Sequence, residues 1–286
     1  MRWKLSALVV LAALAHSTAT AQAAVPLSSP QGIVFDKQGR LYVADYDVDH
    51  VVVYNSQLVQ TAVLSGGMSG PNRLAFDTLG NLYVCNAKGN SITVYGPDGI
   101  QKTSKTITNQ VSSPEGVAVD AYGDVFVANN GSANSITVYN IDGQLVETVT
   151  QDHNGRNFIA PGVVVIQGMN VYVGTGPTSG QSYVSQYNVG EFLTGSLKRI
   201  FSYFDTGDEG PTGIAFDQAG DLFVSDFYTA TIVKYSPSGQ VLMTISTGSC
   251  CQNQGVALDA QGNIYAAYGS SISVYSPTGK LLKTIH

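Results

Sequence analysis

The stretch PTGIAFDQAGDLFVSDFYTATIVKYSPSG, residues 211–239, decides the fold, because three short apolar runs alternate in it with polar turns. The runs are rich in Ile, Val, Phe and Tyr and are bounded by Gly, Asp and Pro, which is the composition of β-strands joined by tight turns. No segment after residue 23 keeps a helical period over ten or more residues. The stretch therefore predicts consecutive antiparallel strands.

The same pattern recurs along the chain. Its opening motif, Pro-x-Gly-apolar-x-apolar-Asp, is found in full or altered form at Pro30, Pro71, Pro114, Pro161 and Pro211, with a last partial copy at Gly255–Asp259. The spacing runs from 41 residues (Pro30 to Pro71) to 50 residues (Pro161 to Pro211). Arg73 replaces the Gly of the second copy, and the fourth copy departs most, with Ile166 and Met169 in place of Asp and Gly.

A four-stranded sheet of this kind would expose two apolar faces if it stood alone. A ring of such sheets buries every face, whereas a linear stack would leave two apolar ends that this chain has no polar segment to cover. We therefore predict an all-β fold, a six-bladed β-propeller of four-stranded antiparallel blades over residues 24–286. The predicted repeats are approximately 28–66, 69–107, 112–150, 159–202, 209–246 and 252–286. Blade 6 is either complete within its own repeat or joined by Val25 to Leu27.

These motifs resemble the NHL repeat, and the resemblance covers nearly all of the chain after residue 23. Pro-x-Gly-Ile-Ala-Phe-Asp, Gly-Asp-Leu-Phe-Val-Ser-Asp and Ile-Val-Lys-Tyr-Ser-Pro-Ser-Gly, between Pro211 and Gly239, carry it. It is specific for the fold and weak for function. With the export-signal pattern of residues 1–23, described next, the chain resembles exported bacterial NHL-repeat proteins.

The first 23 residues have the three parts of a secretory signal peptide. Arg2 and Lys4 precede an apolar run from Leu5 to Ala15, and Ala21-Gln22-Ala23 forms a cleavage site. This run of eleven residues, apolar except for Ser6, is shorter than the roughly 20 residues needed to cross a bilayer. The cleavage site has no Cys, so nothing in the sequence indicates a lipid anchor. We expect a secreted or periplasmic protein without membrane insertion.

The charge balance excludes some classes of partner. The formal net charge is −6, and removal of Arg2 and Lys4 with the leader would make it −8. Nucleic-acid binding proteins need basic patches, so we expect no nucleic-acid partner. We expect a monomer.

Five of the copies carry an Asp followed three residues later by Gly. These residues are Asp36, Asp77, Asp120, Asp217 and Asp259. A carboxylate that accepts hydrogen bonds from its own turn, with Gly in the left-handed conformation, explains this spacing without a catalytic role. Because these turns are uniform, we expect ligands at the opposite rim, where the loops differ in length and chemistry.

The longest loops of that variable rim belong to the fourth and fifth repeats. They hold His153, Arg156 and Asn157, and then Asp205, Asp208 and Glu209. These six residues are the predicted ligand-binding site. The three carboxylates are also candidate ligands of Ca²⁺, which prefers several oxygen donors.

Two smaller clusters complete the candidates. Asp45, Asp47 and Asp49 have the alternating spacing of a calcium loop but lack its Gly and distal Glu, and Asp45 aligns with Asn86, Asn129 and Asp226 at a strand end. Cys250 and Cys251 are adjacent and could form a vicinal disulfide, which would be strained because the two Cα atoms lie about 3.8 Å apart. Cys85 lies inside a strand and is expected to fill the core.

Two functions fit this sequence. The first is an exported scaffold that binds a protein, peptide or glycan through its variable loops. The second is a metal-dependent lyase or lactonase with a carboxylate-rich site near blades 4 and 5, and the resemblance adds that several such relatives use His in the central channel. Only His50, His153 and His286 follow residue 23, and three channel histidines cannot be assembled from them. The sequence therefore favours the binding protein over the enzyme.

Overall fold

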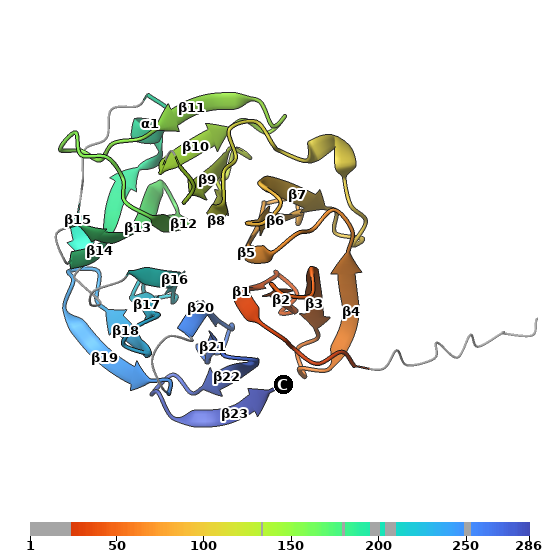
Figure 1. The fold of residues 1–286 in the computed structure, drawn as a ribbon. Helices are drawn as coiled ribbons and strands as arrows, with labels where there is room; N and C mark the ends of the chain where they lie inside the picture. The colour runs from red at the N-terminus through yellow and green to blue at the C-terminus, as the bar shows by residue number, and fades with distance from the viewer. Residues whose placement is uncertain (1–23, 133, 179–180, 195–200, 204–209, 249–252) are drawn as a thin grey trace, which may run out of the picture.

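The computed structural model describes residues 24–132, 134–178, 181–194, 201–203, 210–248 and 253–286 and shows six antiparallel sheets around a central channel (Figure 1). Blade 1 contains β1 (Pro30–Phe35), β2 (Leu41–Asp45), β3 (His50–Tyr54) and β4 (Gln60–Ser65). Blade 2 contains β5 (Pro71–Phe76), β6 (Leu82–Asn86) and β7 (Ser91–Tyr95). Blade 3 contains β8 (Pro114–Val119), β9 (Val125–Asn129), β10 (Ser135–Tyr139) and β11 (Leu145–Val149).

The other three blades follow in the same order around the ring. Blade 4 contains β12 (Pro161–Gln167), β13 (Asn170–Thr178), β14 (Gln181–Asn188) and β15 (Phe201–Tyr203), with the short helix α1 (Val189–Phe192) after β14. Blade 5 contains β16 (Pro211–Phe216), β17 (Leu222–Asp226), β18 (Thr231–Tyr235) and β19 (Val241–Ser246). Blade 6 contains β20 (Asn253–Leu258), β21 (Ile264–Tyr268), β22 (Ser271–Tyr275) and β23 (Leu281–Ile285). The prediction of a six-bladed all-β propeller is confirmed.

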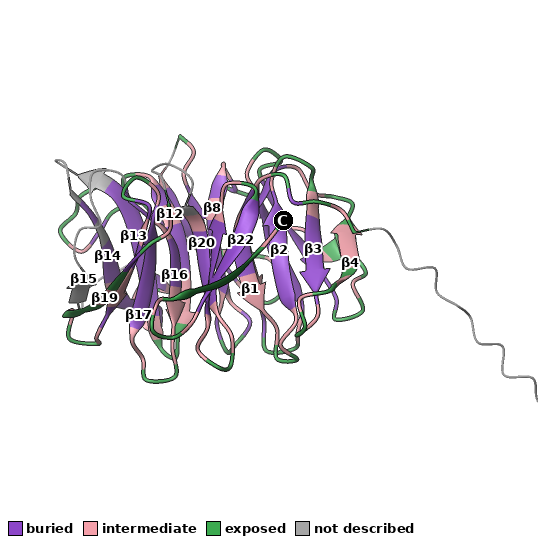
Figure 2. Cartoon of the chain, turned by 90° about the horizontal axis from the view of Figure 1, so that it is seen from below, coloured by how far each residue is buried: buried purple, intermediate pink, exposed green. Residues whose placement is uncertain are grey.

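The apolar core lies between the blades. All five residues of β2, β6, β9 and β17 are buried, because each of these strands is covered on both faces by neighbouring sheets. Each of the six core clusters joins two adjacent blades: Val84 of blade 2 packs with Val51 of blade 1, and Cys85 with Val127 of blade 3. The outermost strands are the most exposed, as Figure 2 shows for β19 and β4. This closed set of contacts excludes the linear stack.

The predicted Asp-Gly turn is confirmed in five blades. In blade 1, Oδ1 of Asp36 accepts hydrogen bonds from the backbone N–H of Gln38 (2.9 Å) and Arg40 (2.8 Å), and Gly39 has a φ of +76°. Asp77, Asp120, Asp217 and Asp259 make the same pair of bonds. Blade 4 instead closes β12 and β13 with the two-residue loop Gly168-Met169, in which Gly168 has a φ of +62°.

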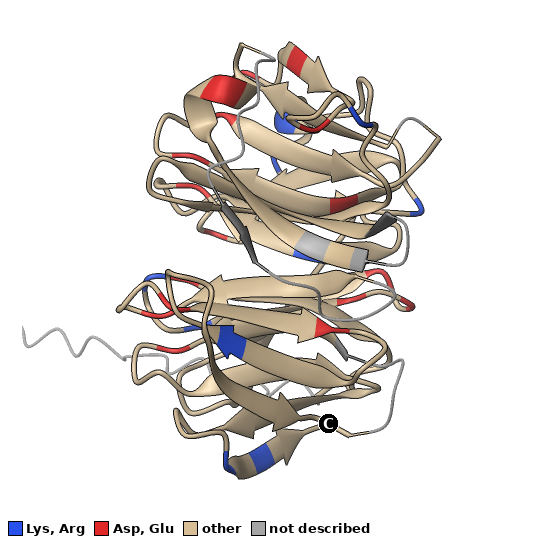
Figure 3. Cartoon of the chain, turned by 90° about the vertical axis from the view of Figure 1, so that its left-hand side faces the viewer, with Lys and Arg blue, Asp and Glu red and all other residues tan. Residues whose placement is uncertain are grey.

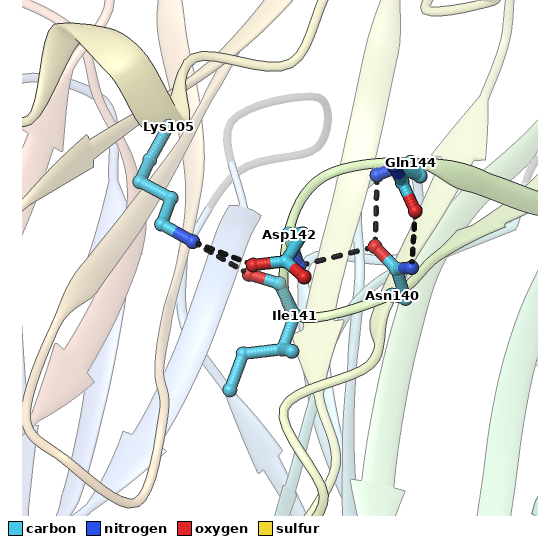
Figure 4. Close-up of polar contacts among 5 residues, drawn as sticks. All are labelled: Lys105, Asn140, Ile141, Asp142 and Gln144. Carbon is cyan, nitrogen blue, oxygen red and sulfur yellow. Dashed lines mark hydrogen bonds and ion pairs between the residues drawn. The ribbon is translucent and has the colours of Figure 1, made fainter.

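Blade 2 differs from the predicted four strands. After β7 the chain makes only the isolated bridges Tyr95–Gln101 and Ile92–Ile107, on either side of the 3₁₀ turn η1 (Thr103–Lys105). The segment from Gln101 to Lys105 is polar and lacks the alternation of a strand. Lys105 then reaches blade 3, where its Nζ lies 3.0 Å from the carbonyl oxygen of Ile141 and 3.4 Å from Oδ1 of Asp142 (Figure 4).

The ring closes without a shared strand. β23 is the outer strand of blade 6, so the structure supports the alternative in which blade 6 is complete within its own repeat. The segment before β1 packs beside this junction: Leu27 is buried, and Val25 contacts the same core cluster as Ile285. The backbone N–H of Val25 donates to Oε1 of Gln60 in β4 (2.9 Å).

Charged residues make up only 12% of the chain, and most of the ribbon in Figure 3 is accordingly uncharged, with short segments of Lys, Arg, Asp and Glu distributed over it. Within the described part of the chain, no helix is long and apolar enough to cross a membrane. The predicted signal peptide, residues 1–23, lies outside the described residues.

Candidate functional site

The two rims of the propeller are built from different connections. The short-turn rim carries the turns between the first and second strands of each blade, such as residues 36–40, and those between the third and fourth strands. Blade 4 departs from the predicted uniform turns, because α1 lies between its third strand β14 and its fourth strand β15. The long-loop rim carries the turns between the second and third strands and the connections between blades, such as residues 66–70 and 150–160. The long-loop rim is the variable rim of the sequence prediction.

Residues 150–160 of the long-loop rim form a small hairpin. Oδ1 of Asp152 accepts hydrogen bonds from the backbone N–H of Asn154 (2.8 Å) and Arg156 (3.0 Å), and Gly155 has a φ of +70°. An isolated bridge joins Gln151 and Asn157. This is the Asp-x-x-Gly turn of the other blades, at the same spacing, so sequence comparison alone could have found it.

The hairpin places the predicted ligand-binding residues away from the channel. The chain leaves β11 at the outer edge of the ring and returns to β12 at its centre (Figure 1). The ring of His153 lies 6.4 Å from that of Tyr187 in β14, and Arg156 and Asn157 are exposed. Asp205, Asp208 and Glu209 lie outside the described residues, so the convergence of all six residues stays a prediction.

Asp45, Asp47 and Asp49 contact three different partners. Asp45 is fully buried, and its carboxylate accepts the backbone N–H groups of Ser28 (2.8 Å) and Ser29 (2.6 Å). Oδ1 of Asp47 lies 3.5 Å from Nζ of Lys88, and Oδ1 of Asp49 accepts the N–H of Gly70 (2.7 Å).

The strand-end position of Asp45 has a structural use in other blades as well. Asn86 accepts the backbone N–H of Ser69, and Asn129 accepts that of Ser112. The described residues contain no group of three or more His, Cys, Asp and Glu side chains that could hold a metal ion. Cys250 and Cys251 lie outside the described residues, whereas Cys85 is fully buried in the core, where burial raises the pKa of its thiol.

The central channel is narrow because the six inner strands approach one another closely. A Cβ atom added to Gly32 would lie 2.5 Å from the carbonyl oxygen of Asn72, and one added to Gly255 would lie 2.4 Å from that of Gln31. Real Cβ contacts are never this short, so glycine is required at these positions. The cavity between the inner strands has a volume of about 60 Å³.

Arg73 places a charged side chain in this channel. One of its guanidinium nitrogens, Nη2, donates across the ring to the carbonyl oxygen of Thr212 in blade 5 (2.6 Å) and to that of Gln254 in blade 6 (3.4 Å). Nη1 donates to the carbonyl oxygen of Asn72 (2.8 Å). Burial lowers the pKa of Arg73, and the negative charge of Glu115 opposes this shift. The guanidinium therefore braces three blades.

A polar pocket of about 250 Å³ opens above Arg73 on the long-loop rim. Its lining includes Gln31, Tyr46, Asn72, Arg73, Lys88 and Glu115. Nζ of Lys88 lies 4.1 Å from the centre of the Tyr46 ring. Nε of Arg73 and Oδ1 of Asn72 are buried, and neither has a hydrogen-bond partner among the described residues. Two residues of the pocket lining, Arg73 and Asn72, thus each have one buried polar atom that the described protein groups do not satisfy.

Sequence reasoning missed this pocket, although it contained the signal. Arg73 stands where four other copies have Gly, and a charged residue in place of a repeated glycine marks a position with a separate role. The pocket also depends on Glu115 and Lys88, which come from blade 3 and from the β6–β7 turn of blade 2. Only the folded ring brings these residues to one mouth of the channel.

The fold defines the class of this protein, a six-bladed β-propeller. The family model described as NHL repeat matches residues 27–54, which contain β1, β2 and β3 of blade 1. No curated protein matches the sequence.

Solved structures with a similar fold include enzymes and a protein complex. Virginiamycin B lyase from Staphylococcus aureus has 16% identity and a TM-score of 0.65, over 91% of this chain and 86% of that chain. A streptogramin B lyase structure has 14% identity and a TM-score of 0.66, over 92% and 84%. A nidogen/laminin complex has 16% identity and a TM-score of 0.67, over 86% and 93%. At these identities the similarity shows the fold alone.

Proposed function

We propose that this protein is a binding module that takes a protein, peptide or glycan ligand at its long-loop rim, with the Arg73 pocket as the anchor. The observation that carries the proposal is the buried pair of Arg73 Nε and Asn72 Oδ1, one donor and one acceptor without a described partner. A peptide amide or a pair of glycan hydroxyls offers both complementary groups. Such convergent polar groups in a concave site are typical of ligand recognition.

The electrostatics of the pocket support a polar ligand. Arg73 and Lys88 carry positive charge and Glu115 carries negative charge, so the pocket does not select for ligands of one charge sign. Tyr46 adds an aromatic face, which suits the apolar side of a sugar or a peptide side chain. The localisation that goes with this function, secreted or periplasmic, depends on residues 1–23 and stays a prediction.

The proposal is tested by probing peptide and glycan arrays with the purified protein and with the variants R73A, E115Q and R156A. We expect the ligands that wild type retains to be lost with R73A and weakened with E115Q. R156A is the matched control, because Arg156 lies on the same rim but on the peripheral hairpin. Ligands that survive R73A but are lost with R156A would instead assign binding to residues 150–160. Thermal melts of all three variants separate lost binding from lost folding.

The enzymatic alternative, a metal-dependent lyase or lactonase near blades 4 and 5, rests on Asp205, Asp208 and Glu209. These residues lie outside the described part of the chain. The similar lyase structures support the propeller fold and carry no catalytic residue over to this chain.

A further inference from the structure

The five repeated Asp residues differ in what their second carboxylate oxygen contacts. Oδ1 makes the same turn in every case, so Oδ2 is the variable atom. In four blades Oδ2 lies within hydrogen-bond distance of a side-chain donor: Asp36 and Nε of Arg40 (2.6 Å), Asp77 and Nδ2 of Asn81 (2.6 Å), Asp217 and Nζ of Lys234 (2.9 Å), and Asp259 and Nδ2 of Asn263 (2.8 Å). A donor at Oδ2 is therefore part of the repeat.

Asp120 of blade 3 breaks this rule. The residue four positions later, which supplies the donor in blades 1, 2 and 6, is here Asp124, and a carboxylate offers none. Asp120 is only 4% exposed, its Oδ2 is buried, and no described residue donates a hydrogen bond to it. Burial raises the pKa of Asp124, and the neighbouring Asp120 raises it further. A buried carboxylate oxygen without a donor is costly, and its retention calls for a partner.

Blade 5 shows which partner suits two carboxylates at this spacing. Asp217 and Asp221 occupy the same two positions as Asp120 and Asp124, and Nζ of Lys234 lies 2.9 Å from each of them. Lys234 pairs in register with Phe223. In blade 3 the corresponding pair is Val138 and Phe126, so no ammonium group comes from this strand.

Asp120 also lines a pocket large enough for a ligand. This pocket, of about 580 Å³, opens on the short-turn rim among blades 1 to 4. Its walls are mainly apolar and include Phe35, Phe76, Val119 and Ile166, with Leu79 at its edge. The lining also includes Asp36 and Asp77, whose Oδ2 atoms are already satisfied. Its two cations are engaged as well, since Nζ of Lys37 donates to the carbonyl oxygen of Thr78 and Arg40 pairs with Asp36. Asp120 Oδ2 is thus the carboxylate oxygen of the described lining that lacks a donor.

We propose that this pocket binds a small organic ammonium ion, with the ammonium group at Asp120 and the apolar body against the Phe35 and Phe76 walls. The volume falls within the range of about 300–1,000 Å³ typical of small-molecule sites. The ligand would supply in blade 3 the charge that Lys234 supplies in blade 5, and Asp124 adds a second negative charge. This site lies on the rim opposite the Arg73 pocket and is independent of the proposed function.

The test compares hexylammonium with hexanol, which has the same apolar chain without the charge. Both are titrated into the ¹⁵N-labelled protein, and binding is followed by amide chemical shifts at Ala121 and Ile166. We expect hexylammonium to bind at least tenfold more tightly than hexanol. In D120N, whose side-chain oxygen can still make the turn, this preference should disappear.

The matched control is D259N, which changes the same turn position in blade 6, outside this pocket, and should keep the tenfold preference. Equal binding of hexanol and hexylammonium to wild type would overturn the proposal. Absence of hexylammonium binding, or an unchanged preference in D120N, would do the same. A loss of preference in D259N as well would assign the effect to the turn and not to the pocket.

Discussion

At the scale of single residues, this protein is informative where one copy of the repeat departs from the others. Arg73 and Lys234 each replace the residue type found at that position in most blades, Gly and Val, and each changes the electrostatics around it. Arg73 brings a guanidinium into a channel where most copies have glycine. Lys234 supplies the cation that Asp217 and Asp221 need, whereas blade 3 has the same acidic pair without the lysine.

Replacement of Arg73 by Ala should destabilise the ring, because it removes the hydrogen bonds to the carbonyl oxygens of Thr212 and Gln254. Hydrogen bonds to charged groups contribute about 1.5–3 kcal/mol, so we expect a loss of about 2 kcal/mol in the free energy of unfolding. Denaturant unfolding measures this loss. R156A, on the exposed hairpin, should change stability by less than about 0.5 kcal/mol. Equal stability of R73A and wild type would show that Arg73 is not a brace.

Replacement of Lys234 by Met should make stability less dependent on acid. Burial raises the pKa of Asp217, but hydrogen bonds from Lys234 and the Asp221 backbone outweigh burial, so the pKa lies below its usual value of 3.8. A carboxyl with a lowered folded pKa stabilises the protein above its unfolded pKa, and this contribution is lost as pH falls through the folded pKa.

Unfolding of wild type and K234M between pH 2 and 7 should therefore show a gap in the free energy of unfolding that narrows toward the acid end. We expect a gap at neutral pH on the order of 1 kcal/mol, since the ion pairs are partly exposed. The control is K105M, whose ion pair with Asp142 is more exposed and should have no measurable effect. A gap of the same size at pH 2 as at pH 7 would mean that Lys234 acts through packing on Phe223 and not through its charge.

At the scale of the elements, the inner strands are the most restricted in the size of the side chains that they can accept. Neighbouring blades meet at the channel with their backbones in close approach, so Gly32, Gly116, Gly213 and Gly255 leave no room for a Cβ atom. The outer strands are the least restricted in sequence and structure. Blade 2 has lost its fourth strand, and α1 follows β14 in blade 4. The sheets tolerate these changes because outer strands bury little surface.

Replacement of Gly255 by Ala should destabilise the protein by about 1–3 kcal/mol, the usual cost of overpacking. The new Cβ would lie 2.4 Å from a backbone oxygen of blade 1, which cannot move without shifting the strand. Gly162 in the inner strand of blade 4 is the matched control, because its nearest neighbour would lie 3.8 Å from the new Cβ. Thermal melts of G255A and G162A measure the difference. Equal melting temperatures would contradict the close approach of β20 and β1.

At the scale of the whole molecule, ring closure is the decisive event. Blade 1 and blade 6 share no strand: β1 and β20 approach closely at the channel, and Leu27 is buried at the junction. Each blade depends on its two neighbours for the cover of its faces, so the ends of the chain must be brought together before the last interface forms. The two proposed binding sites lie on opposite rims of the ring, and their linings differ in polarity.

Replacement of Leu27 by Ala should lower the free energy of unfolding by about 2–4 kcal/mol, because it opens a cavity between blades 1 and 6. The exposed Leu282 on the outer face of blade 6 is the control, since L282A removes the same atoms from a half-exposed site. Denaturant unfolding gives both values. A small effect of L27A, equal to that of L282A, would show that residues 24–29 do not contribute to closure.

The metal prediction is also tested on the whole molecule. If Asp205, Asp208 and Glu209 bind Ca²⁺, added Ca²⁺ should raise the melting temperature above its value in EDTA, because a ligand of the folded state stabilises it. The triple Ala variant should lose this rise, and D142A, which removes an exposed carboxylate of blade 3, should keep it. Absence of any response to Ca²⁺, Mg²⁺ or Zn²⁺ would remove the basis for a metal-dependent lyase or lactonase.

The sequence by itself determined the number of blades, the strand pattern and the Asp-Gly turns. These features depend on contacts between residues that are close in the sequence, and the same residues recur in each repeat. It also marked Arg73 as an exception to the repeat. It did not show the missing strand of blade 2, since an outer strand has few packing partners that its sequence must satisfy.

Only the tertiary structure decided what the exceptions contact. Arg73 and the carbonyl oxygen of Thr212 are 139 residues apart in the chain, and the ring brings them together across its channel. The unsatisfied oxygen of Asp120 became visible only beside its four satisfied counterparts. The physical reason is that a turn is determined by its own few residues, whereas the two channel mouths are assembled from several blades whose distances depend on closure of the whole ring.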